Sequence, residues 1–264
     1  MIFIMKHTKL NRRTFFTIYA GALAAGILDT GPGSSALAQS KPESDRITVP
    51  ELELVGKQRP PLFGQGFNLR KPAAKAFERM CAEAKRDGIH IYSYSSYRNF
   101  DHQKRIWNRK YQLGVRQKMK PIDNIHSILR YSTLPGTSRH HWGTDCDLID
   151  RAQPEPPDPL HGNHFTENGV YFQLYHWLWE NAEKYGFYEV YTNDPRRTGF
   201  AYEPWHWSYA ELSIPFLHQF HTVLIKKYLD SPDISGRNHL TNDFLKRYVR
   251  EWGFGVNPEL IPSV

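Results

Sequence analysis

"SRHHWGTDCDLID", residues 138–150, places two adjacent histidines and three aspartates within thirteen positions. Gly143 predicts a turn, and the residues after it alternate as those of a β-strand do. Because successive side chains of a strand point to opposite faces, Asp145 and Asp147 share one face and the residues between and after them share the other. The stretch therefore predicts a strand with carboxylates on one side, preceded closely by His140.

The composition of the chain fits one folded domain with a sizeable core. The 264 residues are 40% hydrophobic and 14% aromatic, which argues against disorder. The formal net charge is +7, and it falls to +4 once residues 1–38 are set aside. This mild positive charge comes without a Lys/Arg block interleaved with aromatic residues, so it does not indicate a nucleic-acid partner.

The first 38 residues have the layout of a cleavable export signal. A basic start precedes an apolar stretch over 15–28, and "ALA" at 36–38 predicts cleavage after Ala38. The apolar stretch is shorter than the roughly 20 residues of a membrane span, so no integral membrane segment is expected in the mature chain. Arg12 and Arg13 resemble the twin-arginine signal, and an ordinary secretion signal is the alternative. We expect an exported protein of the periplasm or cell envelope.

The remaining segments predict helices and short strands that do not alternate as in a βαβ fold. Residues 39–65 are predicted to form an irregular N-terminal extension. Helical periodicity marks 71–88, 99–114 and 167–187, short strands are expected over 89–98, 188–192 and 199–209, and the tail from Leu212 is mostly helical. This order predicts an α+β fold, with a small antiparallel sheet flanked by helices.

A metal site for hydrolysis is indicated by two separated blocks of the sequence. Such a site needs about three protein ligands, an open position for water and a nearby carboxylate as base. The opening stretch offers His140 and Asp147, and "EPWHW" at 203–207 offers His206 as the third ligand, with Glu203 as the base. Pro204 cannot donate to a sheet ladder, and it can bend the chain so that both side chains reach one cavity.

At this point the sequence resembles the zinc D-alanyl-D-alanine carboxypeptidases, the group that includes the VanY- and VanX-like enzymes. Their pattern is S-x-H-x-x-G-x-A-x-D, followed by E-x-x-H. "SRHHWGTDCD" at 138–147 and "EPWH" at 203–206 match its two parts, and "SSYRNFDHQ" at 95–103 resembles the family's S-x-Y-R segment. The likeness spans roughly residues 66–210. It departs at Asp145, where the family has a small residue, usually alanine.

The resemblance implies a role for each matching residue. In an α+β fold of the hedgehog/DD-peptidase kind, the sheet carries a Zn²⁺ ion held by His140, Asp147 and His206. Glu203 is then the general base, Arg98 stabilises the oxyanion, and Ser138 helps to position the substrate. Residues 66–264 become a zinc peptidase catalytic domain with a helical tail.

The activity implied by the resemblance is hydrolysis of the terminal D-Ala-D-Ala bond of peptidoglycan stem peptides by a monomeric enzyme. An L,D-carboxypeptidase or a peptidoglycan endopeptidase with the same site is the alternative among enzymes. A non-catalytic zinc-bearing binding module is an alternative of another class. The presence of both Glu203 and Arg98 favours an enzyme, because a silent module could lose either residue.

Two further assignments stay open at the level of sequence. We assign Asp145 to the site, where it could bind the substrate's ammonium group or hydrogen-bond a ligand histidine; the alternative is a solvated place at the rim. Cys146 is expected to face away from the metal, and Cys81 lies on the apolar stripe of the helix over 71–88. The two cysteines either form a disulfide or remain as two buried thiols.

Overall fold

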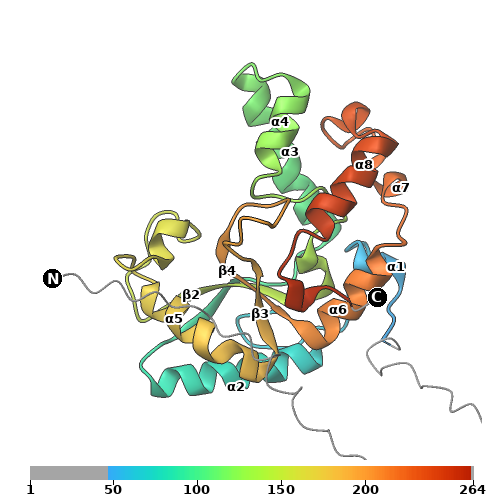
Figure 1. The fold of residues 1–264 in the computed structure, drawn as a ribbon. Helices are drawn as coiled ribbons and strands as arrows, with labels where there is room; N and C mark the ends of the chain where they lie inside the picture. Colours follow the sequence, from blue (N-terminus) through green and yellow to red (C-terminus); the bar gives the residue numbers. More distant parts are fainter. Residues whose placement is uncertain (1–46, 263–264) are drawn as a thin grey trace, which may run out of the picture. The chain divides into compact units, whose positions relative to one another are not determined.

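A computed structural model describes residues 47–262 of the chain (Figure 1). The predicted export signal over 1–38 and the first part of the predicted extension lie outside the described residues. Within the described range, no helix combines the length and apolarity that a membrane span requires.

The predicted small antiparallel sheet is confirmed, and its four strands lie in the order β1-β2-β4-β3. The strands are β1 (Ile91–Ser95), β2 (Asp145–Asp150), β3 (Phe187–Tyr191) and β4 (Glu203–Tyr209). The central strands β2 and β4 are buried along their whole length. Their register sets Asp147 directly opposite His206, and this pairing positions the site described below.

The helices pack around the sheet, with α2 and α5 on one side and α3, α4 and α8 toward the other (Figure 1). Their bounds are α1 (Glu51–Leu54), α2 (Lys71–Arg86), α3 (Phe100–Arg116), α4 (Pro121–Ile128), α5 (Phe172–Asn181), α6 (Ala210–Phe220), α7 (Lys226–Leu229) and α8 (Asn242–Tyr248). The mostly helical tail is confirmed by α6, α7 and α8. The predicted helix over 167–187 is shorter than expected, because α5 ends in a 3-10 turn that Gly186 closes with a positive φ of 76°.

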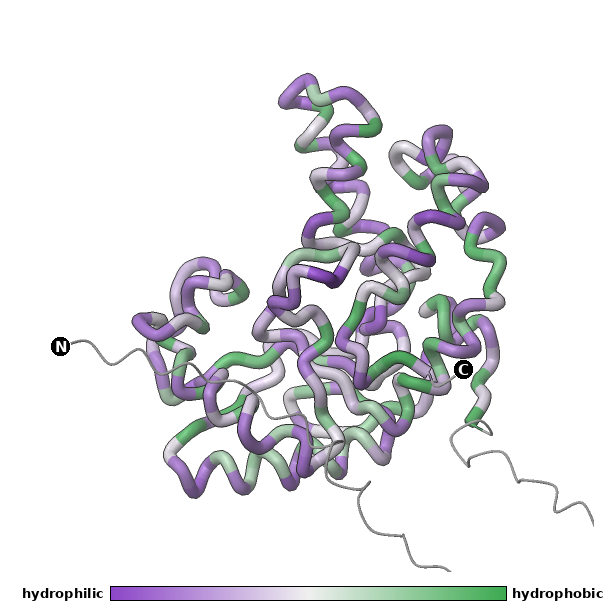
Figure 2. Tube along the Cα trace, viewed as in Figure 1, coloured by the Kyte–Doolittle hydropathy of each residue, from purple (hydrophilic) through white to green (hydrophobic). Residues whose placement is uncertain are grey.

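Helix α2 shows how the apolar pattern fixes one layer of the fold. Pro72 lies in the first turn, where its missing N–H costs nothing, and Gly88 follows the end of the helix with a φ of +80°. Hydrophobic and hydrophilic residues alternate along the helix (Figure 2). Its buried side includes Phe77, whose ring lies edge-on to that of Phe187 in β3, with the centroids 6.0 Å apart. This face of α2 covers the back of the sheet.

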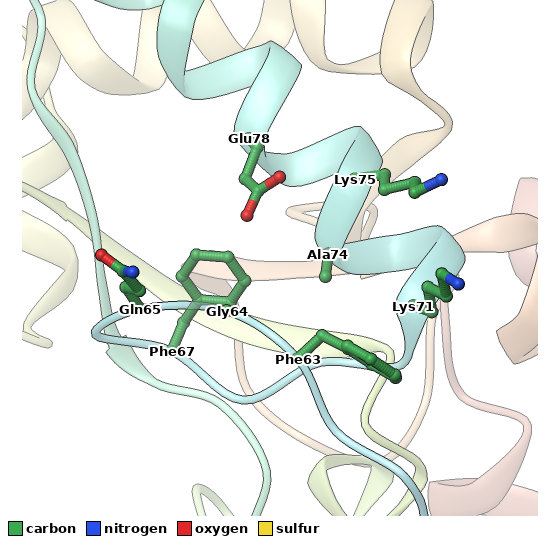
Figure 3. Close-up of a pocket in the computed structure, with 8 residues that line it drawn as sticks. All are labelled: Phe63, Gly64, Gln65, Phe67, Lys71, Ala74, Lys75 and Glu78. Carbon is green, nitrogen blue, oxygen red and sulfur yellow. The ribbon is translucent and has the colours of Figure 1, made fainter.

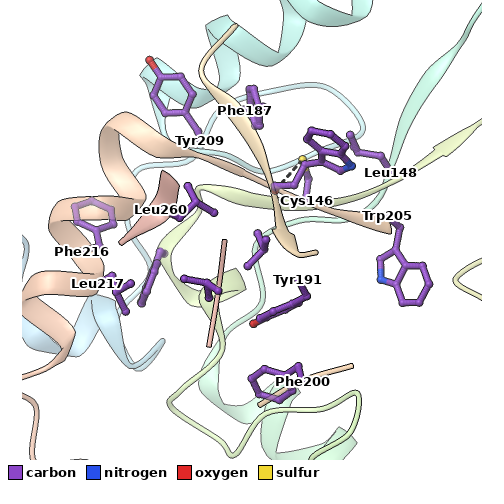
Figure 4. Packing of buried hydrophobic residues seen from close by; sticks show 14 of the residues in the cluster. Cys146, Leu148, Phe187, Tyr191, Phe200, Trp205, Tyr209, Phe216, Leu217 and Leu260 are labelled. Carbon is purple, nitrogen blue, oxygen red and sulfur yellow. Dashed lines mark hydrogen bonds between the residues drawn. The ribbon is translucent and has the colours of Figure 1, made fainter. Parts of the chain in front are cut away.

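The two cysteines lie on the same back side as free thiols. Cys146 is fully buried in the apolar cluster, and its Sγ lies 3.8 Å from the carbonyl oxygen of Trp207 (Figure 4). Cys81 is partly buried in α2, and burial raises the pKa of its thiol to about 12. Of the two predicted alternatives, the structure shows thiols and not a disulfide.

Gly143 provides the predicted turn into β2. Its φ of +67° lies in the left-handed region, and a Cβ atom there would stand 2.8 Å from Cδ2 of Leu62. The carbonyl oxygen of Gly143 accepts a hydrogen bond from the backbone N–H of Arg70 at 2.7 Å. The turn therefore needs glycine both for its backbone conformation and for the space around it.

We expect Gly143→Ala to destabilise the protein more than Gly88→Ala does. Both changes force alanine into a left-handed conformation, at about 1–2 kcal/mol each. A Cβ at Gly88 would meet no atom within 4 Å, whereas at Gly143 it would stand 2.8 Å from Cδ2 of Leu62, so that side chain must also shift. Urea unfolding of both variants measures the difference in free energy of unfolding. Equal losses would contradict a steric requirement at Gly143.

Candidate metal centre

Three predicted ligands from three segments meet at one point of the structure. His140 lies in the 3-10 turn Arg139–Trp142, Asp147 in β2 and His206 in β4. One ligand atom from each of them lies within 4.8 Å of the other two. Nε2 of His140 is 3.3 Å from Oδ2 of Asp147, and Nδ1 of His206 is 3.7 Å from its Oδ1. All three residues are buried.

The other nitrogen of each imidazole is held by an acceptor. Nδ1 of His140 lies 2.7 Å from the backbone oxygen of Ser96, and Nε2 of His206 lies 3.1 Å from Oδ1 of Asp145. Acceptors at these positions fix the N–H on the nitrogen that faces them. Nε2 of His140 therefore carries the free lone pair and points toward Asp147, while Nδ1 of His206 faces both Asp147 and Glu203.

The donor set fits a zinc ion. Oδ1 of Asp147 is buried and has no hydrogen-bond partner among the described residues, which is costly for a carboxylate oxygen unless a cation satisfies it. Two imidazole nitrogens and one carboxylate are ligands that Zn²⁺ takes in catalytic sites, with a further position left open. Although burial opposes it, Asp145 and Glu203 raise the pKa of His206 to about 9, so the surroundings favour positive charge here.

Glu203 and Arg98 flank the three ligands. Oε2 of Glu203 lies 3.2 Å from Nδ1 of His206, and burial raises the pKa of this carboxyl group. The guanidinium of Arg98 donates to Oε1 of Gln103 at 2.8 Å and to Oγ of Ser95 at 3.1 Å. Burial lowers its pKa, but Asp147 and Glu203 lie close enough to oppose that shift. The carboxylate of Glu203 and the fixed guanidinium of Arg98 thus line the cavity beside the three ligands.

These groups line a single cavity of about 1010 Å³. Ser138 lines it as well. A second depression lies between the loop over 63–67 and α2 (Figure 3). It contains none of the predicted site residues, so the larger cavity is the candidate site.

Asp145 lies behind the ligands and not in the cavity where a substrate would bind. The carboxylate is fully buried and does not line the cavity, which also excludes the solvated rim. Its Oδ1 accepts from Nε of Arg139 at 2.8 Å and its Oδ2 from Oγ of Ser208 at 2.9 Å. Burial alone would raise the pKa of Asp145, but Arg139 and His206 lower it well below its ordinary value. Of the three predicted alternatives, the contact with a ligand histidine is the one that the structure contains.

His141, next to the ligand His140, has a structural place. It is completely buried, its Nδ1 hydrogen-bonds the backbone oxygen of Arg98, and its Nε2 accepts from the N–H of Gly136 at 3.2 Å. Burial lowers the pKa of His141 to about 3, so the ring is neutral. It fixes the backbone that carries Arg98.

Residues in and beside the cavity include some to which the sequence motifs assign no role. Lys110 of α3 and Tyr191 of β3 both line it, and the Tyr191 ring stands edge-on to His206 with the centroids 5.1 Å apart. Gln103, which holds Arg98, is fully buried. The four-residue spacing of His102, Ile106 and Lys110 on α3 is the one pattern that could have placed Lys110 on the same side.

A buried His–Asp–His set beside a carboxylate is the arrangement of a hydrolytic metal centre. The sequence profile of the VanY family, described as D-alanyl-D-alanine carboxypeptidase, matches residues 66–212. This match covers over half of the chain, and the chain therefore belongs to the VanY family.

Individual relatives are similar over most of the chain. The putative carboxypeptidase YodJ of Bacillus subtilis is 28% identical over 189 residues, which are 71% of this chain and 62% of that protein. The chain thus matches less than two thirds of the length of this relative. A D-alanyl-D-alanine carboxypeptidase of Enterococcus faecalis is 29% identical over 215 residues, 76% of this chain and 73% of that protein. Among solved structures, VanYB in complex with D-alanine-D-alanine is 20% identical, with a TM-score of 0.47, over 65% of this chain and 88% of that one.

We expect Asp145→Ala to destabilise the fold by about 3–5 kcal/mol, because it leaves the buried guanidinium of Arg139 without its carboxylate. Urea unfolding measures the loss. The double variant Arg139→Leu/Asp145→Ala is the matched control, since it removes both charges and should recover part of the stability. An Asp145→Ala protein as stable as the wild type would contradict a structural role for this pair.

Proposed function

We propose that the protein is a zinc-dependent carboxypeptidase that hydrolyses the terminal D-Ala-D-Ala bond of peptidoglycan stem peptides. The observation that carries this proposal is the convergence of His140, Asp147 and His206 within 4.8 Å, with Glu203 Oε2 3.2 Å from Nδ1 of His206. Membership of the VanY family supports the reaction and the substrate class.

In this proposal His140, Asp147 and His206 hold Zn²⁺, which when bound polarises the scissile carbonyl and makes water acidic enough to react at neutral pH. Glu203 removes a proton from the attacking water as its oxygen bonds to the carbonyl carbon. When the C–N bond breaks, Glu203 returns the proton to the departing amine. Before a metal ion binds, burial raises the pKa of this carboxyl group, which makes it a stronger base.

Arg98 stabilises the negative charge that develops on the carbonyl oxygen. Its guanidinium is held in place before the substrate arrives, by Gln103 and Ser95, so no reorganisation is needed during the reaction. Ser138 lines the cavity beside the ligands and positions the peptide.

The proposed substrate also fits the predicted export of the chain. Peptidoglycan lies outside the cytoplasm, where the signal predicted over residues 1–38 would deliver the protein, and the twin-arginine route agrees with Arg12 and Arg13. One chain supplies all the proposed ligands together with Glu203 and Arg98, so the enzyme acts as a monomer in this proposal.

The product of the reaction tests the function directly. Incubation of the zinc-loaded protein with stem pentapeptide is expected to release one alanine, read from the product masses. Release of a larger fragment would instead identify an endopeptidase. The stem tetrapeptide, which lacks the last alanine, is tested in parallel, and cleavage of the tetrapeptide alone would identify an L,D-carboxypeptidase. No cleavage of either peptide would overturn the enzyme proposal in favour of a binding module.

Two substitutions distinguish the role of the general base from that of a metal ligand. We expect Glu203→Ala to keep bound zinc and to lose about 10²–10⁴ in kcat, the contribution typical of a general base. His206→Ala should lose both zinc and turnover, because two protein ligands remain. Metal analysis after dialysis and peptide hydrolysis measure the two properties separately. Full activity of Glu203→Ala would show that another group removes the proton.

A further inference from the structure

Lys110 places a cation in the wall of the candidate active-site cavity. It lies on α3 on the same helix face as His102 and Ile106, and all three line the cavity that holds His140, Asp147 and His206. The side chain is partly buried, and its Nζ donates to Oγ of the buried Ser132 at 2.6 Å. Lys110 therefore stands at a fixed place in the cavity and not in bulk solvent.

The segment that receives this hydrogen bond is tied to the catalytic wall. Nε2 of Gln103 donates to the backbone oxygen of Thr133 at 2.9 Å, and Oε1 of the same Gln103 accepts from Arg98. The hydroxyl oxygen of Thr133 is buried and has no hydrogen-bond partner among the described residues. One wall of the cavity is therefore polar, with Lys110, Ser132 and Thr133. Gln103 fixes its position relative to Arg98, because it hydrogen-bonds both Thr133 and Arg98.

The charge of Lys110 has no carboxylate to pair with. Across residues 47–262, no aspartate or glutamate lies within 4.0 Å of its Nζ. Glu203 acts on Lys110 from a greater distance, while burial and the cations Arg109 and Arg98 lower its pKa. Of the acidic residues that line the cavity, Asp147 and Glu203 already serve as ligand and base in the proposed function, and Asp158 makes no ion pair with Lys110. A partly buried cation in a ligand cavity without its own counter-ion is suited to bind an anionic group of the ligand.

We propose that Lys110, together with Ser132, binds the free C-terminal carboxylate of the substrate peptide. This inference rests on the proposed function. It assigns to Lys110 the preference of that site for a peptide with a free C-terminus. A carboxypeptidase differs from an endopeptidase in requiring a chain end one residue beyond the scissile bond. Lys110 supplies the charge that recognises this end, whereas Arg98 remains available for the carbonyl oxygen.

The test compares two stem pentapeptides that differ only at the last group, a free carboxylate or a carboxamide. The quantity measured is the ratio of kcat/KM for the acid to kcat/KM for the amide. We expect Lys110→Met to lower this ratio about tenfold to a hundredfold, the range of a hydrogen bond to a charged group. The change should lie mainly in KM, and Lys110→Arg should retain more of the preference.

Arg105→Met is the matched control. Arg105 is exposed on the same helix and does not line the cavity, so its loss removes one positive charge without touching the proposed contact. We expect the acid-to-amide ratio of this variant to stay within about twofold of the wild type, since a distant exposed charge is screened. An equal fall in both variants would mean that the overall charge of α3 acts, and would overturn the specific role of Lys110.

Two further measurements keep the proposal falsifiable if Lys110→Met does not fold. A wild-type enzyme that cleaves acid and amide equally well would overturn it without any variant. A third pentapeptide, with its interior carboxyl groups amidated and its end free, identifies the carboxylate that is bound. Loss of the Lys110 effect with this peptide would assign Lys110 to an interior carboxylate and overturn the proposal. Failure of the wild type to cleave any of these peptides would instead overturn the proposed function.

Discussion

The antiparallel pairing of β2 with β4 is the constraint on which the site depends. It sets Asp147 opposite His206 although the two residues are 59 positions apart in the chain. The turn at Gly143 then brings His140 to the same point, and the pairing of β1 with β2 brings the segment that carries Arg98 alongside. A slip of one residue in this register would turn Asp147 to the apolar back of the sheet. The fold and the metal centre are therefore specified by the same hydrogen-bond ladder.

Buried polar groups next to the paired strands hold the metal ligands and Arg98 in place through hydrogen bonds. Asp145 links His206 to Arg139 and Ser208, and His141 anchors the backbone of Arg98. Within this network Nη1 of Arg139 is buried without a hydrogen-bond partner among the described residues, so the network is not fully satisfied. The face of the sheet that carries the ligands is thus polar, while the back face, with Cys146 and Leu148, is packed as an apolar core (Figure 4).

Much of the site was predictable because its signals are local. The alternation after Gly143 places Asp145 and Asp147 on one face, and the short motifs contain His140, Glu203 and His206. The surroundings were not predictable in the same way. Whether Asp145 meets substrate or a ligand histidine depends on Arg139 folding behind it, and the place of Lys110 depends on how α3 packs along the cavity. Such tertiary contacts leave no periodic pattern in the sequence. Helix α4 is a different case, because Pro121 at its start and the buried Ile125 and Ile128 are local signals, although no element is predicted there.

The contacts of Asp145 have a consequence for substitutions at this position, where the family usually has alanine. A carboxylate introduced alone at this position of a relative with alanine would be buried without a counter-ion, and an arginine introduced alone at position 139 would be equally unfavourable. Positions 139, 145 and 208 are therefore energetically coupled, and their substitutions are not additive. The cost of replacing any one of them depends on which residues stand at the other two.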